Sequence, residues 1–392
     1  KLCGTALITS SEREEMNGII ITPITDPAAM ALWVGTLSAS ISLPARLDPV
    51  SWHAHEFLFG YVTAIVAGFL LTAVASWTGR SPVLGWPLGI LFALWLAGRV
   101  AVAFSALLSP IAVALVDLAM PVALVAVIAR EIVAGQSWRN LIVLTLLIAL
   151  IVGNALFHWD AYRGAYAAGG VGLRLGLGTT VMMIAVIGGR IVPSFTRNWL
   201  VKRGETKLPA PTGRFDALAL VFLLGALVAW IAAPSALATG AILTVASLVH
   251  GARLLRWVGI KTGAEPLVWV LHVGYGLVPL GALMMGLSIM TNDAATARAA
   301  QHVWMAGAIG LMTLAVMTRA TLGHTGRALH SGWVTTLIYV LIMLSVAVRL
   351  TAGALPSASH SLHLISGLAW IGAFGVFIAL YGPMLLNPRE PR

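Results

Sequence analysis

The sequence predicts an all-α membrane protein, built as a bundle of about twelve transmembrane helices. The chain is 59% hydrophobic and only 10% charged, whereas soluble domains carry about 25% charged residues. Apolar runs of about 18 residues or more recur from end to end, and each is long enough to span a bilayer. The runs are evenly apolar, whereas the strands of a membrane barrel alternate in polarity, so the runs indicate helices.

Each apolar run is predicted as one helix, and the loops between the runs are short except for 192–213. In chain order the predicted helices span residues 28–46, 53–77, 82–105, 109–130, 138–158, 170–191, 214–233, 236–257, 266–290, 299–320, 331–350 and 360–386. The first run is the weakest, because Ser38, Ser40 and Ser42 dilute its apolar character. Pro193 lies near the predicted end of the sixth helix, where proline is tolerated.

The domain organisation that follows is simple. Residues 1–27 are predicted as an N-terminal tail, and residues 28–390 as a single transmembrane helical domain. The polar stretch Ser10–Asn17 is not typical of a signal peptide. The single cysteine, Cys3, can form neither an internal disulfide nor a thiolate metal site.

The basic residues predict the orientation of the bundle, because lysine and arginine concentrate in cytoplasmic loops. Most of them fall at one face, including four in the 192–213 segment. The opposite face holds only Arg46, Arg163, Arg298 and Arg349. Both termini are therefore predicted to be cytoplasmic. The same distribution accounts for the net charge of +10, which does not indicate a nucleic-acid partner.

This orientation sorts the ten histidines by depth. Those near the outer ends of helices are His53, His55, His158, His302, His360 and His363, and those in the inner half are His250, His272, His324 and His330. His302 and His324 lie on one helix and its end, ~33 Å apart at helical rise, so they cannot bind one metal. If the chain has two metal sites, we expect one outer and one inner.

The segment Trp-His-Ala-His-Glu at residues 52–56 opens the second predicted helix. Neutral imidazole suits haem iron and copper, and a nearby carboxylate can orient it. His53 and Glu56 share a helix face that continues through Gly60, which is small enough for a flat macrocycle or another helix to approach. His55 points roughly the other way, so the two histidines have different partners. An interfacial belt with ordinary hydrogen bonds explains this segment equally well.

Two later helices also carry histidines. His302 lies at the outer end of the tenth helix, and His324 lies in the polar loop at its inner end. On its own, His324 is better explained as a loop residue that caps a helix. His272 lies about two turns inside the ninth helix, where a histidine can simply bond to a neighbouring helix. Its depth nevertheless favours an inner site shared with His324 or His250.

Arginines mark the inner ends of three helices. Arg80, Arg190 and Arg319 could hold haem propionates, because the guanidinium group matches carboxylates bidentately. The cytoplasmic excess of basic residues explains them equally well. Arg99 and Asp117 lie at similar depth on neighbouring predicted helices, and we interpret them as a structural ion pair. The sequence lacks a Walker motif, a Cys-x-x-Cys-His haem attachment and a dinucleotide fingerprint.

Taken together, these motifs resemble those of the NnrS family over roughly residues 50–390. The matching stretches lie at 52–60, 67–80, 188–196, 271–275, 307–327 and 381–389. The start departs from the family, because an expected Arg/Phe-rich stretch before the first helix is replaced by Ile24–Met30. The resemblance implies a twelve-helix protein of the bacterial inner membrane that contains haem b and copper. It also implies a link to nitric oxide, denitrification and nitrosative-stress defence.

With that resemblance, specific ligands can be assigned. We expect His302 and either His53 or His55 to ligate haem iron, Glu56 to orient an imidazole, and Arg80, Arg190 and Arg319 to contact the haem. His53, His55, His272 and His324 are the expected metal ligands. Nitric oxide is the expected gaseous ligand, and a second copy of the chain or an electron donor remains open as a partner. A nitric-oxide-handling oxidoreductase competes with a secondary transporter of an anion or metal complex, although no internal repeat favours the transporter.

Overall fold

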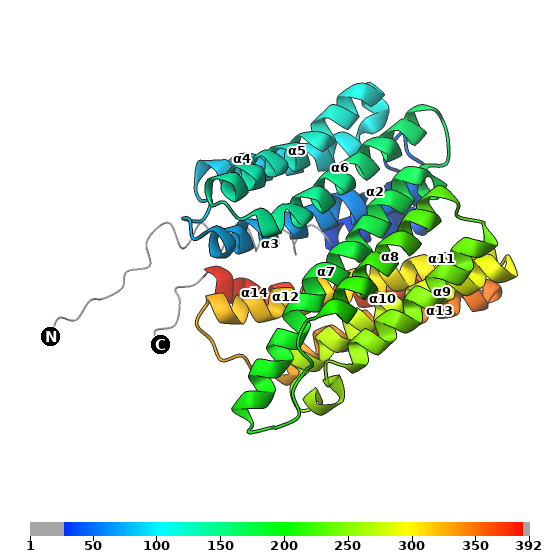
Figure 1. The fold of residues 1–392 in the computed structure, drawn as a ribbon. Coiled ribbons are helices and arrows are strands. Elements are labelled where there is room, and N and C mark those ends of the chain that lie inside the picture. The colour runs from blue at the N-terminus through cyan, green and yellow to red at the C-terminus, as the bar shows by residue number, and fades with distance from the viewer. Residues whose placement is uncertain (1–26, 387–392) are drawn as a thin grey trace.

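The computed structural model describes residues 27–386, and all of its regular elements are helices (Figure 1). Eleven of these helices are long and apolar enough to cross a membrane. The predicted fold class, an α-helical multi-pass membrane protein, is therefore confirmed. The structure does not determine which face of the bundle is cytoplasmic, so the orientation of the termini stays a prediction.

The described chain begins with a short helix, Pro27–Leu37, and continues with eleven longer ones. The second helix comprises α2 (Pro49–His55), η1 (Glu56–Tyr61) and α3 (Val62–Thr78). The next are α4 (Trp86–Ala103), α5 (Pro110–Ala134), α6 (Leu141–Tyr162), α7 (Val171–Lys202), α8 (Arg214–Ala232), α9 (Leu237–Leu255) and α10 (Pro266–Thr291). The last are α11 (Ala294–His302), η6 (Val303–Ile309) and α12 (Gly310–His324) as one rod, then α13 (Trp333–Ala354) and α14 (Ser359–Leu386).

The first predicted helix, 28–46, is wrong at its end, because the helix stops at Leu37. The serines that dilute this run also terminate it. The Ser38 hydroxyl donates to the carbonyl of Gly35 and lies 3.0 Å from the Ser40 hydroxyl, and Ala39 has a φ of 56°. Such local bonds offer the backbone an alternative to the helix.

The predicted loop 192–213 is also corrected, because α7 runs through Pro193 to Lys202. Proline removes one helical hydrogen bond, but neighbouring groups in a bundle can offset that loss. Val192, Thr196 and Leu200 repeat at four-residue spacing and are all fully buried, so packing on this face continues the helix past the proline.

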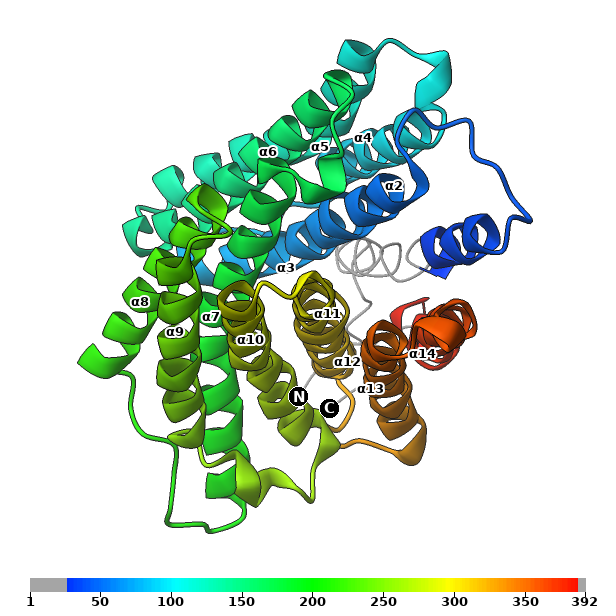
Figure 2. The ribbon, with the colours of Figure 1, turned by 90° about the vertical axis from the view of Figure 1, so that its right-hand side faces the viewer.

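Four rods form the centre of the bundle. In the spans Pro49–Thr78, Val171–Lys202, Pro266–Thr291 and Ala294–His324, 61–72% of the most apolar window is buried, against 28–44% in the other seven. Helices α4, α5 and α6 lie together on one side, and α13 and α14 lie on another (Figures 1 and 2). The sequence motifs at His53, His55, His272 and His302 are thus all on central helices.

Two of these central rods contain π-helical segments. η1 begins directly after His55, and η6 begins directly after His302. Such segments are rare and are frequently found at functional sites, because the wider turn redirects side chains. Their positions single out the N-terminal end of the α2–α3 rod and the middle of the α11–α12 rod.

Candidate functional site

The two histidines of α2 face different neighbours, as their spacing predicts. Asp48 caps the helix by accepting from the backbone N–H groups of Val50 and Ser51, and Pro49 occupies its first turn. These features start the helix before the motif. His53 and His55 are therefore both helical, and two positions of helix rotate one side chain about 200° from the other.

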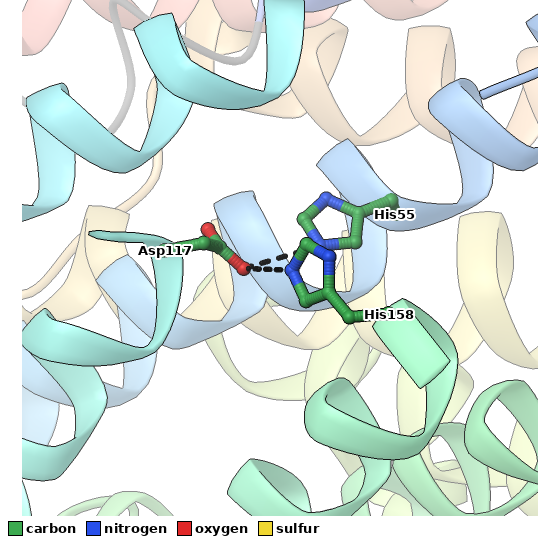
Figure 3. Close-up of side chains that lie close together, drawn as sticks. All are labelled: His55, Asp117 and His158. Atoms are coloured by element: carbon green, nitrogen blue, oxygen red, sulfur yellow. Dashed lines mark hydrogen bonds and ion pairs between the residues drawn. The ribbon is translucent and has the colours of Figure 1, made fainter. Parts of the chain in front are cut away.

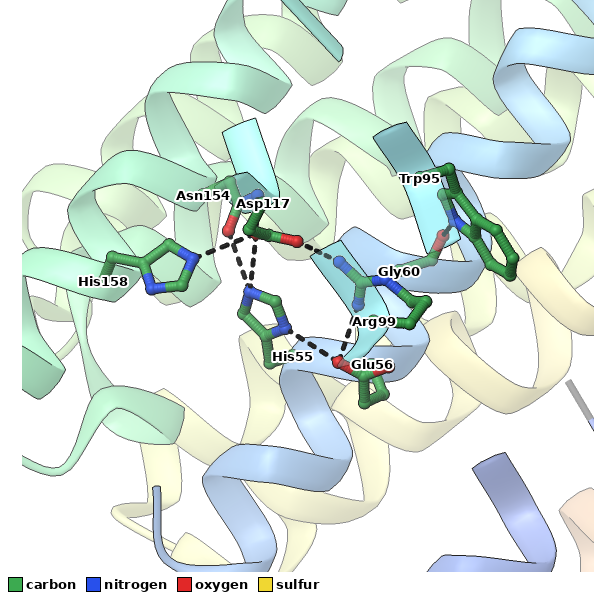
Figure 4. A network of polar contacts seen from close by, with 8 residues as sticks. All are labelled: His55, Glu56, Gly60, Trp95, Arg99, Asp117, Asn154 and His158. Atoms are coloured by element: carbon green, nitrogen blue, oxygen red, sulfur yellow. Dashed lines mark hydrogen bonds and ion pairs between the residues drawn. The ribbon is translucent and has the colours of Figure 1, made fainter. Parts of the chain in front are cut away.

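His55 turns into a buried polar cluster between three helices (Figure 4). Its Nε2 lies 3.2 Å from Asp117 Oδ2 on α5, and it donates to Asn154 Oδ1 on α6 at 3.0 Å. His158 Nε2, one helical turn beyond Asn154, lies 2.9 Å from the same Asp117 oxygen (Figure 3). His55 and Asp117 are fully buried, and the His158 side chain is only 10% exposed.

Arg99 on α4 closes the other side of this cluster. Its guanidinium donates to Glu56 Oε1 at 2.6 Å and to Asp117 Oδ1, so the predicted Arg99–Asp117 pair is confirmed. Glu56 Oε1 also lies 3.3 Å from His55 Nδ1. A Cβ on Gly60 would collide with the Arg99 guanidinium. The space that Gly60 provides is thus filled by arginine, not by a macrocycle.

His53 lies on the opposite side of α2, toward the α11–α12 rod. Its ring stacks on Trp33 with centroids 4.3 Å apart, and its Nδ1 is buried without a hydrogen-bond partner among the described residues. His302 and Arg349 lie within electrostatic reach of His53, and Arg349 also lies within reach of His302. His302 Nδ1 donates to the Arg298 carbonyl at 2.8 Å, which leaves its Nε2 as the free ring nitrogen.

The histidines expected to form an inner site have separate surroundings. His272 Nε2 bonds to the Thr196 hydroxyl at 2.7 Å, whereas its Nδ1 is buried without a partner. His324 is exposed, and no hydrogen bond or ring contact within residues 27–386 joins it to His272. His250 uses both ring nitrogens, one toward the Tyr275 hydroxyl and one toward the Ala219 carbonyl. His250 is therefore a satisfied core histidine.

The three inner arginines differ in their surroundings. Arg80 pairs with Glu131 at 2.6 Å, and Arg190 is exposed. Arg319 lies over the Phe195 ring, 4.1 Å from its centroid, beside a cavity of about 630 Å³. This cavity lies between α3, α7 and α12, and its lining is apolar apart from a few groups that include Arg319, Asn198 and His324.

Sequence reasoning missed most of the partners of His55. Asn154 and His158 lie four residues apart on one face of α6, which is a detectable sign of a polar stripe in an otherwise apolar helix. That this stripe meets Asp117 and His55 follows only from how α2, α5 and α6 pack together.

A family model described as NnrS protein matches residues 24–389, which is nearly the whole chain. No curated protein matches the sequence.

Proposed function

We propose, because this chain belongs to the NnrS family, that it is a haem- and copper-binding protein of the bacterial inner membrane that acts on nitric oxide. Family membership supports a nitric-oxide-related membrane protein in general. The finer proposal is a role in nitrosative-stress defence alongside denitrification, in which a redox metal centre handles nitric oxide or iron–nitrosyl species. The observation that carries it is the buried Nδ1 of His53, which has no hydrogen-bond partner among the described residues and lies within electrostatic reach of His302, with a π-helical segment close after each histidine.

The donor set of this pair fits haem iron. His53 Nδ1 is buried and has no hydrogen-bond partner among the described residues, and such an orphaned nitrogen is costly unless something binds it. His302 has its Nδ1 tied to a carbonyl, the arrangement that fixes a metal-binding imidazole through its other nitrogen. His53, rather than His55, is thus the α2 histidine suited to face His302. A haem b held by this pair would supply a redox-active iron, which would be open to nitric oxide when one of the two imidazoles is displaced.

The propionate contacts need a different arginine from those expected. Arg319 lies ~25 Å along the rod from His302 at helical rise, so it cannot reach a haem that His302 ligates. Arg80 lies farther still from His53 and pairs with Glu131. Arg349 on α13 is near both histidines, is half-buried, and has no salt bridge within residues 27–386. In this proposal Arg349 neutralises one propionate.

Aromatic residues around His53 hold its ring in place and shield it from water. Trp33 and Phe57 pack against the His53 ring, with Phe57 centred 4.7 Å away. These rings exclude water and restrict the imidazole. Because nitric oxide is small and uncharged, it can reach such a site through the bilayer. Its redox conversion needs an electron donor, which we place among the partners together with a second copy of the chain.

The test is the haem content and the reduced-state spectrum of purified variants. His53→Ala and His302→Ala should each lose most of the haem, because axial ligation is what retains a haem without thioether links. His330→Ala is the matched control, since His330 is exposed and pairs with Glu265 instead. Full haem and an unaltered spectrum in His302→Ala would exclude this ligation and direct the search to His272 and His324.

The cavity beside Arg319 favours a second candidate, a transporter of an anion or metal complex. Arg319 makes no salt bridge within residues 27–386, so an anion in this cavity would meet an unneutralised cation. Proteoliposomes loaded with the protein would take up nitrite if this candidate is correct, and Arg319→Gln would abolish the uptake. Haem-dependent nitric oxide consumption without any nitrite uptake would favour the first proposal.

A further inference from the structure

The cavity of about 630 Å³ between α3, α7 and α12 is as deep as one leaflet of a membrane. Its lining on the α11–α12 rod begins at Ile309 and ends at His324, which are ~22 Å apart at helical rise. One leaflet with its headgroup region is half of a bilayer of about 40–45 Å, so it is about 20–22 Å deep. A single lipid molecule therefore matches the cavity in length.

The part of the cavity that lies deep in the bundle is apolar. Residues such as Val62 and Ile309 line it, together with the three threonines Thr72, Thr180 and Thr313. Each threonine donates its hydroxyl to a carbonyl of its own helix, three or four residues earlier, at 2.9 Å. These hydroxyls are already satisfied, so the deep part of the cavity suits a hydrocarbon chain.

Polar groups of a different kind line the opposite end, near the C-terminal ends of α7 and α12. Asn198 and His324 are exposed there, and Arg319 is half-buried between them and the apolar part. The Arg319 guanidinium lies over the Phe195 ring, 4.1 Å from its centroid. This contact with the ring face uses none of the N–H donors, and within residues 27–386 they make no hydrogen bond or salt bridge.

Glu265 lies within electrostatic reach of Arg319, but its oxygens bond to other groups. Its Oε2 pairs with His330 Nδ1 at 2.8 Å, and its Oε1 accepts from the backbone N–H groups of Ser331 and Leu267. Arg319 thus has no directly bonded counterion among the described residues. A cation in this position is costly in a membrane, and its planar donors match a phosphate group.

We propose that this cavity binds one anionic phospholipid, with its phosphate on Arg319 and an acyl chain in the apolar part. A free inorganic anion would pair with the arginine but would leave most of the apolar lining uncovered. A lipid without net charge would cover the lining but would leave the cation unneutralised. Basic pockets between transmembrane helices on the cytoplasmic side bind anionic headgroups, and the charge distribution predicts that this end is cytoplasmic.

The lipid site is separate from the proposed haem, because Arg319 and His302 are ~25 Å apart along the rod. Failure of one proposal therefore leaves the other intact. A resident lipid would, however, occupy the cavity that the anion-transport candidate requires.

The experiment removes lipid from the purified full-length protein in detergent and adds phosphatidylglycerol or phosphatidylcholine with identical acyl chains. Native mass spectrometry counts the bound lipids per chain. The parent should bind one phosphatidylglycerol at least about tenfold more tightly than phosphatidylcholine, because a hydrogen-bonded ion pair is made only with the former. Arg319→Gln should lose this preference, and Arg319→Lys should keep most of it. Arg130→Gln is the matched control, since Arg130 is exposed and pairs with Glu131 outside the cavity.

Gly68→Leu tests the acyl-chain part of the site separately. Gly68 lines the cavity, and a Cβ there would meet nothing within 4 Å, so leucine enters the cavity without a collision. It should weaken the binding of both lipids severalfold, whereas Gly225→Leu on the exposed face of α8 should not.

Two results would overturn the lipid site. One is equal binding of the two lipids by the parent, or an unchanged preference in Arg319→Gln, which would remove the role of the cation. The other is an inorganic phosphate ion that abolishes the phosphatidylglycerol preference while Gly68→Leu binds both lipids as the parent does. That result would reassign the cavity to a free anion.

Discussion

Arg99 is the residue on which the buried polar cluster depends. It bonds to carboxylates from two other helices, Glu56 beside α2 and Asp117 on α5, while its side chain is only 14% exposed. Gly60 leaves room for its guanidinium, and a Cβ on Gly98 would lie 3.1 Å from Asp117 Oδ1. Two glycines thus allow the close helix packing that brings these charges together.

Removing this arginine should destabilise the protein strongly. Arg99→Met leaves two buried carboxylates without their cation, and breaking a buried pair in this way costs about 3–5 kcal/mol. Arg46→Met is the matched control, because Arg46 is exposed in a loop and such changes stay within about 0.5 kcal/mol. Thermal unfolding in detergent measures both. Equal midpoints for the two variants would show that the cluster contributes little to stability.

The π-helical segment η6 is the element that sets the direction of His302 relative to α12. A π segment accommodates an extra residue in a helix. Each extra residue rotates the preceding part of the helix by about 100° about the helix axis. Its seven residues lie between His302 and the tightly packed start of α12, where a Cβ on Gly310 would meet the Trp370 ring. The α12 side of the rod is therefore fixed by packing, and the register of η6 determines where His302 points.

Deletion of Ala306 tests this role. The shorter rod should relax toward α-helix and turn His302 away from His53, so haem content should fall severalfold while the helical content measured by circular dichroism is unchanged. Deletion of Ala328, in the loop after α12, is the control and should keep the haem. Retention of haem by the Ala306 deletion would mean that η6 is not needed to orient His302.

The local sequence predicts where helices form better than it predicts which helices pack against each other. The apolar runs predict about twelve transmembrane helices, and eleven of them are long enough to span a bilayer in the described residues, because length and apolarity are sufficient to require a helix there. The end of the first helix at Leu37 and the continuation of α7 through Pro193 depend on hydrogen bonds and packing that composition does not reveal. The opposite directions of His53 and His55 follow from helix geometry. The contact of His55 with Asp117 and His158 depends on which apolar helices pack side by side. These helices contain too few polar residues for the sequence to indicate that packing.

At the scale of the whole molecule, two loops mark opposite faces of the bundle. The segment after α7 lies beside the end of α9, because Ala210 N–H donates to the Arg256 carbonyl at 3.1 Å and Lys261 pairs with Glu205. Helix α10 begins at this same end and runs from Pro266 to Thr291, a length of ~39 Å at helical rise. The turn at Asn292 and Asp293 is therefore on the other side of the membrane.

The charge distribution predicts which of these faces is cytoplasmic, and cysteine labelling tests it. In a Cys3→Ser background, Thr206→Cys should react with a membrane-impermeant maleimide only after the cytoplasmic side is opened, since its loop is among the most basic of the chain. Ala294→Cys should react in intact cells. Both positions are exposed, so accessibility within the fold does not limit either reaction. The reversed pattern would invert the bundle and place the His53–His302 pair on the cytoplasmic side. Labelling of both positions from one side would contradict the course of α10 across the membrane.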